Sequence, residues 1–223
     1  MGGQPTVTQD VYLTMPIYIL TSERTFSAAE GLAYNLKYLK NAVIVGDTTR
    51  GGAHSTRSFG LGNGFVAFIP FSRGEHIVTK TDWEGTGVIP NIPIKEEMSL
   101  LKAQELILQK KLAGLKDTTE KLKLQWLLND LHSKMINVAV PAETLNKYAG
   151  VFEEFLFTLE DGKLYCSNTH QKDKKDMLVA INNQLFKIDE QSQVEFVIDN
   201  DGAVKKIRLL WDDGWVDIIK RSK

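Results

Sequence analysis

The sequence contains a single cysteine, Cys166, so it has no internal disulfide framework. No apolar run approaches the ~20 residues that a membrane-spanning helix needs, and we therefore expect no membrane span. The formal net charge is −1, and no cluster of lysine and arginine forms a basic patch of the kind that binds nucleic acid. The lysines of QKDKKDM (171–177) are interrupted by acids, and we interpret this stretch as a solvated loop.

Motifs for phosphates and metals are also missing. The glycine-rich stretch TRGGA (49–53) has no Walker lysine–serine pair and does not fit G-x-G-x-x-G, so phosphate binding is not expected. No Cys/His spacing predicts a zinc site. We therefore expect neither a cofactor nor a metal. The opening residues, MGGQPTVTQD, lack the apolar segment of a signal peptide.

What is present is an ordinary globular composition, 43% hydrophobic and 25% charged, over 223 residues. PIYILT (16–21) and NAVIVGD (41–47) read as buried strands. Between them, from Ser27 to Leu39, apolar residues recur at spacings of three and four, which predicts an amphipathic helix. A strand, a helix and a strand of these lengths predict a right-handed crossover and a parallel sheet.

The next stretch is rich in glycine. Residues 48–64 contain five glycines, and we interpret them as a long loop of the kind that is usually functional or mobile. GFVAFIPFS (64–72) predicts a third strand, and residues 81–94 are irregular. Two amphipathic helices are expected at 96–113 and roughly 118–137.

From Leu145 the chain reads as eight short strands, which predict a small antiparallel barrel or sandwich. Asp-Gly pairs at 161–162 and 201–202 indicate tight hairpin turns, because both central residues can take positive φ. We therefore divide the chain into a core at 1–95, a helical segment at 96–140 and an antiparallel β domain at 141–223.

Ser27 allows two interpretations. Ser27-Ala28-Ala29-Glu30 fits the capping box S-x-x-E, which needs no catalysis and is favoured by spacing alone. Alternatively, a serine on a sharp strand-to-helix turn presents its oxygen to a cleft, where the helix N-terminus stabilises an oxyanion. The two differ in whether the hydroxyl folds onto the helix or faces outward.

A nucleophilic serine needs a base. The four histidines are candidates, but no spacing marks one as the base: His54, His76, His132 and His170. Glu84, in WEGTG, could orient a base or bind a substrate amine, and Asp82 is a weaker candidate for the same roles. A solvent-exposed turn is the simpler interpretation of both carboxylates.

Three motifs then follow in a known order: YILTSERTFSAAE, AVIVGDTTRGGA and TDWEGTGVIPNIPI. Over residues 16–95 the chain resembles the tail-specific (carboxyl-terminal processing) serine protease family. The branch it looks closest to includes interphotoreceptor retinoid-binding protein and the tricorn protease core. The resemblance implies a crotonase/ClpP-like ββα superhelix and so an α/β fold class. It also implies that Ser27 is the nucleophile and that the Ala28 amide donates to the oxyanion.

The resemblance also bears on the other site residues. Glu84 matches the glutamate that follows the nucleophile in the tricorn-like branch. Gly52 stands where another branch has a catalytic lysine, so a Ser-Lys dyad is excluded. We assign Gly51 and Gly52 to substrate binding. The family's upstream histidine-bearing segment is not in this sequence. We therefore expect the C-terminal part of a longer exported protein, inactive or nearly so by itself because a triad acts as a unit.

The implied activity is hydrolysis of peptides or unfolded proteins through an acyl-enzyme, and a homo-oligomer is compatible with it. The rival is a non-catalytic carrier of retinoid or fatty acid, or a peptide-binding protein, on the same fold. A crotonase-type acyl-CoA enzyme is disfavoured by TFSAAE. Residues 145–221 resemble the small β domain often appended to bacterial hydrolases.

Overall fold

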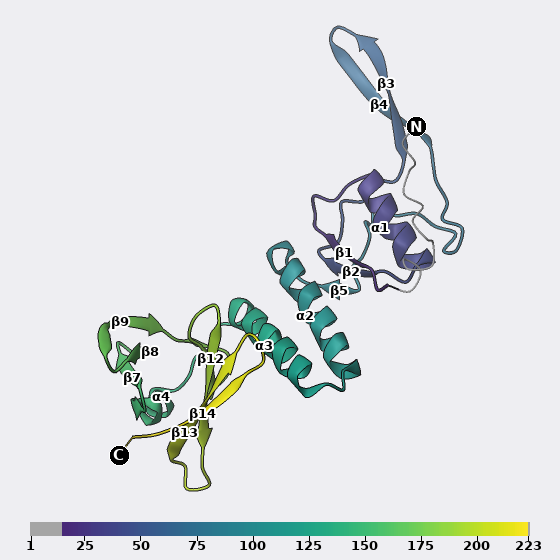
Figure 1. Ribbon diagram of the computed structural model, residues 1–223. Helices are drawn as coiled ribbons and strands as arrows, with labels where there is room; N and C mark the ends of the chain where they lie inside the picture. Colours follow the sequence, from purple (N-terminus) through teal and green to yellow (C-terminus); the bar gives the residue numbers. More distant parts are fainter. Residues whose placement is uncertain (1–14, 223) are drawn as a thin grey trace, which may run out of the picture. The chain divides into compact units, whose positions relative to one another are not determined.

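A computed structural model describes residues 15–222, except for the side chains of residues 171–173. The chain divides into two compact units, Met1–Ala103 and Gln104–Lys223, and the division falls inside one helix, α2 (Glu96–Gly114). The elements are labelled in Figure 1.

The first unit contains a three-stranded parallel sheet in the order β1–β2–β5, with α1 joining the first two strands. These elements are β1 (Tyr18–Thr21), α1 (Ala28–Leu39), β2 (Val43–Gly46) and β5 (Ile92–Pro93). The predicted strand–helix–strand arrangement and its parallel pairing are confirmed. The core beneath the helix is small and consists of Ala33, Tyr34, Ile44 and Val88, with Ile19 and Trp83 packed against it.

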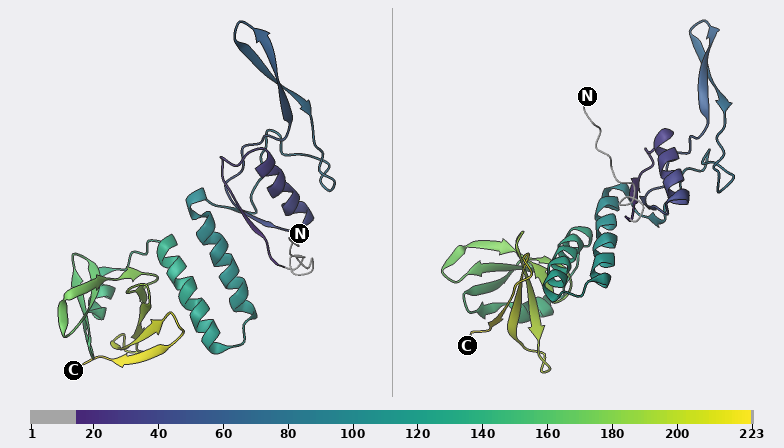
Figure 2. Two further views of the ribbon diagram at one scale, coloured as in Figure 1. Left: turned by 45° about the horizontal axis from the view of Figure 1, so that its top comes forward. Right: turned by 45° about the vertical axis from the view of Figure 1, so that its right-hand side comes forward.

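A long hairpin extends from this unit, away from α1, β1 and β2, in Figure 1 and in both views of Figure 2. It consists of β3 (Ser55–Gly62) and β4 (Phe65–Ser72), which pair antiparallel. The prediction of a loop over 48–64 was therefore wrong for β3, whereas the strand expected at 64–72 is confirmed. Asn63 and Gly64 have φ of 49° and 82°, and an Asn-Gly pair with two positive φ values makes a tight hairpin turn.

Two helices follow at the predicted places, α2 and α3 (Thr118–Met135). Asp117 caps the second helix, because its side chain accepts a hydrogen bond from the Glu120 amide at 2.8 Å. None of the helices within residues 15–222 is both long and apolar enough to cross a bilayer.

The second unit continues with a short helix and two antiparallel sheets. The helix and the first sheet are α4 (Ala142–Tyr148), β6 (Gly150–Phe152), β7 (Phe155–Glu160), β8 (Lys163–Asn168) and β9 (Gln171–Met177). Two predictions were wrong here. Residues 145–148 are helical, and residues 171–177 form a strand rather than a solvated loop. β9 lies at the edge of its sheet, where alternating charge is a common protection against further pairing.

The second sheet has the order β10–β11–β12–β13–β14. Its strands are β10 (Val179–Ala180), β11 (Leu185–Lys187), β12 (Ser192–Ile198), β13 (Val204–Trp211) and β14 (Val216–Lys220). Asp161 and Gly162 both have positive φ, as predicted. In the second Asp-Gly pair only Gly202 has a positive φ, and the connection between β12 and β13 is longer than the one between β7 and β8.

One hydrophobic core joins the two sheets and α4, so the domain resembles a sandwich and neither sheet closes into a barrel. Both sheets and α4 can be followed in the right-hand view of Figure 2. Aromatic rings fill the centre: Tyr148 of α4 stacks on Phe196 of β12 with ring centroids 4.1 Å apart. The Tyr148 hydroxyl is satisfied by the Asn183 carbonyl at 2.7 Å, which lets a polar group enter this core.

Candidate functional site

Ser27 lies on the turn between β1 and α1, directly before the first helical residue, Ala28. Its backbone has φ 56° and ψ −119°, which is the conformation of the first central residue of a type II′ turn and belongs mostly to glycine. Ser27 and Ala28 are both exposed. A strained, exposed serine at the point where a strand turns into a helix has the geometry of a nucleophile elbow.

The Ser27 side chain takes part in a capping box with Glu30 at the start of α1, as their spacing predicts. Its hydroxyl lies toward the Glu30 amide, but this contact falls short of the geometry of a cap hydrogen bond. The well-formed half of the box is the other one, in which the Ser27 amide donates to Oε2 of Glu30 at 2.7 Å. The backbone of the turn is thus fixed while its hydroxyl stays at the surface, beside the unpaired amides and partial positive charge of the helix N-terminus.

The Glu30 carboxylate holds the turn against the glycine-rich loop. Glu30 is fully buried. Besides the Ser27 amide, it accepts hydrogen bonds from the Thr49 hydroxyl (2.5 Å), the Gly51 amide (2.6 Å) and the Gly52 amide (2.9 Å). One buried side chain therefore sets the position of the serine relative to the loop.

Glu30 stays charged although it is buried. Burial alone would raise its pKa, but the hydrogen bonds from Thr49, Gly52, Gly51 and Ser27 outweigh burial, and the pKa lies below its ordinary value. A carboxylate that accepts several hydrogen bonds is stabilised in its ionised form, so these contacts are strongest at neutral pH.

Gly51 and Gly52 are tied into the protein on both sides of their backbones. Their amides donate to the Glu30 carboxylate. The Gly51 carbonyl accepts from the Gly85 amide at 2.9 Å, and the Gly52 carbonyl accepts from Nε1 of Trp83 at 3.3 Å. The lack of a side chain at Gly52 has a direct cause, because a Cβ there would lie 2.2 Å from the Phe26 ring. The loop is thus a fixed wall beside Ser27, with its polar backbone groups already paired.

Glu84, Asp82 and His54 lie together where the β3–β4 hairpin begins. Oε2 of Glu84 accepts from the amides of Ala53 (2.6 Å) and His54 (2.9 Å). Nε2 of His54 is 3.2 Å from Oδ2 of Asp82, and its Nδ1 is 3.9 Å from Oε2 of Glu84. Asp82 also accepts from Nε of Arg73 at 3.0 Å. The imidazole therefore faces a carboxylate on each side.

Hydrogen bonding keeps both of these carboxylates ionised. The amides of His54 and Ala53 lower the pKa of Glu84, and the Glu84 amide, followed by the His54 side chain, lowers the pKa of Asp82. In this arrangement each nitrogen of His54 lies within ion-pair distance of a carboxylate.

The cluster is joined to the serine through the loop. The amides of Ser27 and Gly52 donate to the same oxygen of Glu30, and His54 follows Gly52 by two residues. The structure thus brings the predicted residues Ser27, Ala28, Gly51 and Gly52 into one region, and Glu84 is attached to it through the Ala53 and His54 amides.

The hydrogen bonds of His76 and His132 involve other residues. His76 is buried, and its Nδ1 accepts from the amides of Val78 and Thr79 at 3.3 and 3.2 Å. His132 pairs with Glu105 at 2.9 Å in the second unit. Among the described residues, no group of three or more potential ligands has a metal-binding arrangement.

Sequence reasoning missed the role of Glu30, which it treated only as the N3 residue of a capping box. Its burial could not be foreseen from spacing, because the amides that satisfy it come from a loop about twenty residues later. The available signal was an acidic residue in the first turn of a helix, Glu30, together with a later glycine pair, Gly51 and Gly52, whose amides lie outside any predicted helix or strand.

A comparison with protein families gives one match, in the N-terminal part of the chain. Residues 3–94, less than half of the 223-residue chain, match the model of peptidase family S41. The matched stretch contains Ser27, Glu30, the glycine pair and Glu84. The match supports assignment of this part of the chain to the S41 peptidase family and, with it, a serine peptidase function in general.

Proposed function

We propose that this protein is a serine peptidase in which Ser27 attacks the carbonyl carbon of a peptide bond. The observation that carries the proposal is the backbone of Ser27, which has a positive φ at an exposed strand-to-helix turn and is held there by a buried carboxylate. A strain of about 1–3 kcal/mol is kept in a fold only where the surrounding structure enforces it, and such positions cluster at active sites.

In the proposed reaction the Ser27 oxygen bonds to the carbonyl carbon while a general base takes the hydroxyl proton. The amide of Ala28, at the N-terminus of α1, donates to the oxyanion. Return of the proton to the leaving amine gives an acyl-enzyme, which water hydrolyses. Glu84 takes the role of the carboxylate that orients the base, and Gly51 and Gly52 border the substrate. The substrates are peptides or unfolded proteins.

The order of the three motifs supports the finer parts of the proposal. These are a place in the tail-specific branch, a crotonase-like core and an exported location. Among the elements described, the parallel β1–β2 pair with its crossover helix is compatible with that core.

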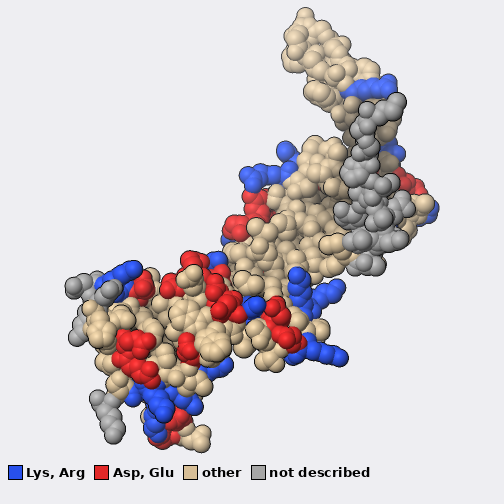
Figure 3. Space-filling model, viewed as in Figure 1, with Lys and Arg blue, Asp and Glu red and all other residues tan. Residues whose placement is uncertain are grey.

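One observation favours a second candidate, a carrier of hydrophobic ligands or peptides. Fifteen of the sixteen strand residues of the β3–β4 hairpin are exposed, with Phe65 at 71% and Phe68 at 72%. In Figure 3 the hairpin is almost entirely uncharged. A large exposed apolar surface marks a binding site more often than not. The two candidates differ in whether Ser27 is needed.

Substitution of the nucleophile separates them. In the full-length protein, Ser27→Ala is expected to reduce hydrolysis of an unfolded protein substrate such as casein by a factor of about 10³ or more. Ser22→Ala, on the same turn, is the matched control and is expected to retain activity. Undiminished hydrolysis by Ser27→Ala rejects the proposal, and saturable retinol or oleate binding without hydrolysis favours the carrier.

A further inference from the structure

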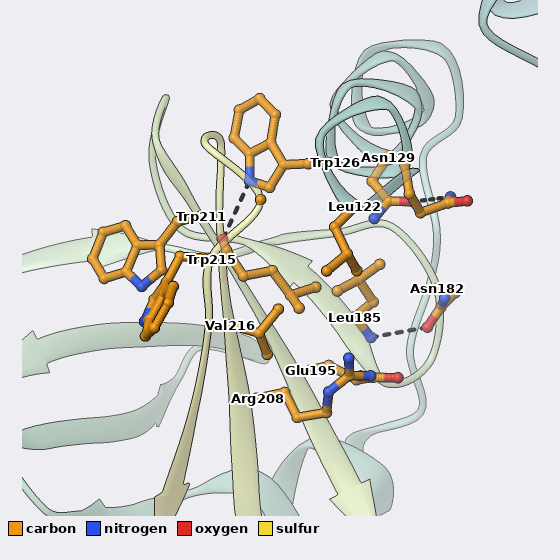
Figure 4. A pocket seen from close by; sticks show the side chains of 13 residues that line it. Leu122, Trp126, Asn129, Asn182, Leu185, Glu195, Arg208, Trp211, Trp215 and Val216 are labelled. Carbon is orange, nitrogen blue, oxygen red and sulfur yellow. Dashed lines mark hydrogen bonds and ion pairs between the residues drawn. The ribbon is translucent and has the colours of Figure 1, made fainter. Parts of the chain in front are cut away.

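The second unit contains a cavity of about 310 Å³ between α3 and one face of the five-stranded sheet. This size lies within the range of small-molecule sites. Figure 4 shows its lining, with Leu122 and Trp126 from the helix and Leu185, Val216 and an Arg208–Glu195 pair from the strands. Trp211 and Trp215 lie together on the other side of the cavity.

A close backbone approach places Trp215 at the rim. Gly214, in the turn between β13 and β14, has φ of 84°, and a Cβ there would lie 2.9 Å from the Thr119 carbonyl of α3. Only glycine allows this contact without displacement. The next residue, Trp215, is 66% exposed, and a large exposed aromatic side chain that is fixed in orientation is typical of binding surfaces.

Every tryptophan N–H at this cavity is already used. Nε1 of Trp126 donates to the Leu210 carbonyl at 3.2 Å. Nε1 of Trp211 and Nε1 of Trp215 donate to the two oxygens of Asp217, at 2.8 and 2.9 Å. These bonds fix the rings, and they leave only the ring surfaces to contact a ligand. Recognition of a proline-rich peptide would instead need an indole N–H for the peptide carbonyl.

The polar groups at the cavity are both donors and acceptors, and they carry no net charge. Gln125 lines the cavity, and its Nε2 donates to Asn129 at 2.9 Å, so the Gln125 oxygen remains as an acceptor. Arg208 and Glu195 pair at 2.6 Å and are 40% and 33% exposed. Because Glu195 neutralises Arg208, the cavity is not suited to an anion.

Hydrogen bonds between side-chain amides keep this arrangement rigid. Nδ2 of Asn129 donates to Oε1 of Gln193 at 3.0 Å, and Nε2 of Gln193 donates to the Trp126 carbonyl at 3.0 Å. Gln193 is fully buried. The helix wall of the cavity is thereby attached to β12, and its side chains are held before any ligand arrives, which reduces the entropy cost of binding.

We propose that this cavity binds a neutral sugar residue of a glycan. A pyranose has an apolar face of C–H groups, which stacks on an aromatic ring, and a rim of hydroxyls that each donate and accept. The Trp215 ring supplies the first surface. The Gln125 amide and the Arg208–Glu195 pair supply hydrogen-bond donors and acceptors for the hydroxyl rim. The site is separate from Ser27 and does not depend on the proposed peptidase activity.

The test is a titration of the intact protein with maltotriose, cellotriose and chitotriose. Saturable binding of at least one trisaccharide is expected by calorimetry, with saturation transfer to its ring C–H protons by NMR. Trp215→Ala is expected to weaken that binding about fivefold or more, because loss of one aromatic stacking contact costs at least that factor. Ile218→Ala, which removes an exposed apolar residue of β14 outside the cavity, is expected to bind like the unaltered protein.

Trp215 is exposed, so its replacement is not expected to unfold the domain, and far-ultraviolet circular dichroism checks this. The proposal is overturned if none of the three trisaccharides binds or if folded Trp215→Ala binds as tightly as the unaltered protein. Saturable binding of a polyproline peptide at this cavity in place of sugar also overturns it.

Discussion

At the scale of single residues, two side chains that are three positions apart set the character of the site. Ser27 has a backbone conformation that an L-residue rarely adopts, and Glu30 is buried with its charge intact. Neither feature is needed to start a helix, because a serine cap normally has extended backbone angles and an exposed acid serves equally well in the first turn. Together they describe a serine that is held in an unfavourable conformation.

The strain at Ser27 predicts the relative stability of two variants at this position. Ser27→Gly is expected to be more stable than Ser27→Ala by about 1 kcal/mol, because glycine accepts the positive φ and also tolerates the cap position better. Thermal and urea unfolding of the two variants measures this difference. If the alanine variant is the more stable one, the backbone of Ser27 is not strained.

The Glu30 carboxylate predicts a dependence of stability on pH. Its folded-state pKa is lowered, so its contribution is complete above the unfolded glutamate pKa of about 4.3 and is lost as pH falls through the lower folded-state pKa. Glu30→Gln is expected to destabilise the protein by about 1–3 kcal/mol at pH 7, because donors are left poorly paired. The gap between the two proteins is expected to narrow below about pH 4.

Urea unfolding at pH 7 and pH 3.5 measures that gap, with Glu23→Gln as a control on the same exposed turn. A gap that is unchanged at the acidic pH, or absent at neutral pH, contradicts the role given to Glu30.

At the scale of elements, the β3–β4 hairpin is held by its own pairing and little else. The turn Asn63-Gly64 and the pairing of β3 with β4 explain why it forms. Its apolar side chains are exposed, so they contribute surface for binding rather than burial.

Exposure predicts that these side chains can be replaced without loss of stability. The double substitution Phe65→Ser and Phe68→Ser is expected to change the free energy of unfolding by less than about 0.5 kcal/mol and to increase solubility. Phe157→Ser, in the buried core of the second unit, is the contrasting variant and is expected to cost about 3–5 kcal/mol. A large loss from the hairpin variant would mean that the hairpin is packed against other residues.

The hairpin also shows what the sequence could and could not predict. β1, α1 and β2 have clear apolar periodicity and were predicted with their parallel pairing. The glycines of β3 hid its alternation, although the Asn-Gly pair is a known hairpin signal. In β9 the alternating charges suggested solvent, and they mark an edge strand instead. The site was predictable where a local turn carried it, at Ser27. It was not predictable where distant backbone amides meet a buried acid, at Glu30.

At the scale of the whole molecule, each unit has its own internal bonds. In the second unit, Lys187 of β11 is buried and pairs with Asp130 of α3 at 2.7 Å, and Lys134 pairs with the same carboxylate. With the Asn129–Gln193 bond, these contacts make α3 part of the β domain.

The buried pair predicts a local effect on stability. Lys187→Met is expected to destabilise the second unit by about 2–4 kcal/mol, less than complete loss of a buried pair because Lys134 still compensates Asp130. Amide hydrogen exchange is expected to accelerate in β11, β12 and β13, with β1 and β2 as the internal reference. Unchanged exchange in the second unit contradicts the importance of this pair.

The central claim is that the hydroxyl of Ser27 is reactive, and covalent labelling tests it most directly. The intact protein is treated with a fluorophosphonate, which phosphonylates activated serines, and the modified residue is located by peptide mass spectrometry. We expect one adduct on Ser27, absent from Ser27→Ala and retained by Ser22→Ala. An unmodified Ser27 in a folded protein that still hydrolyses peptides would contradict it.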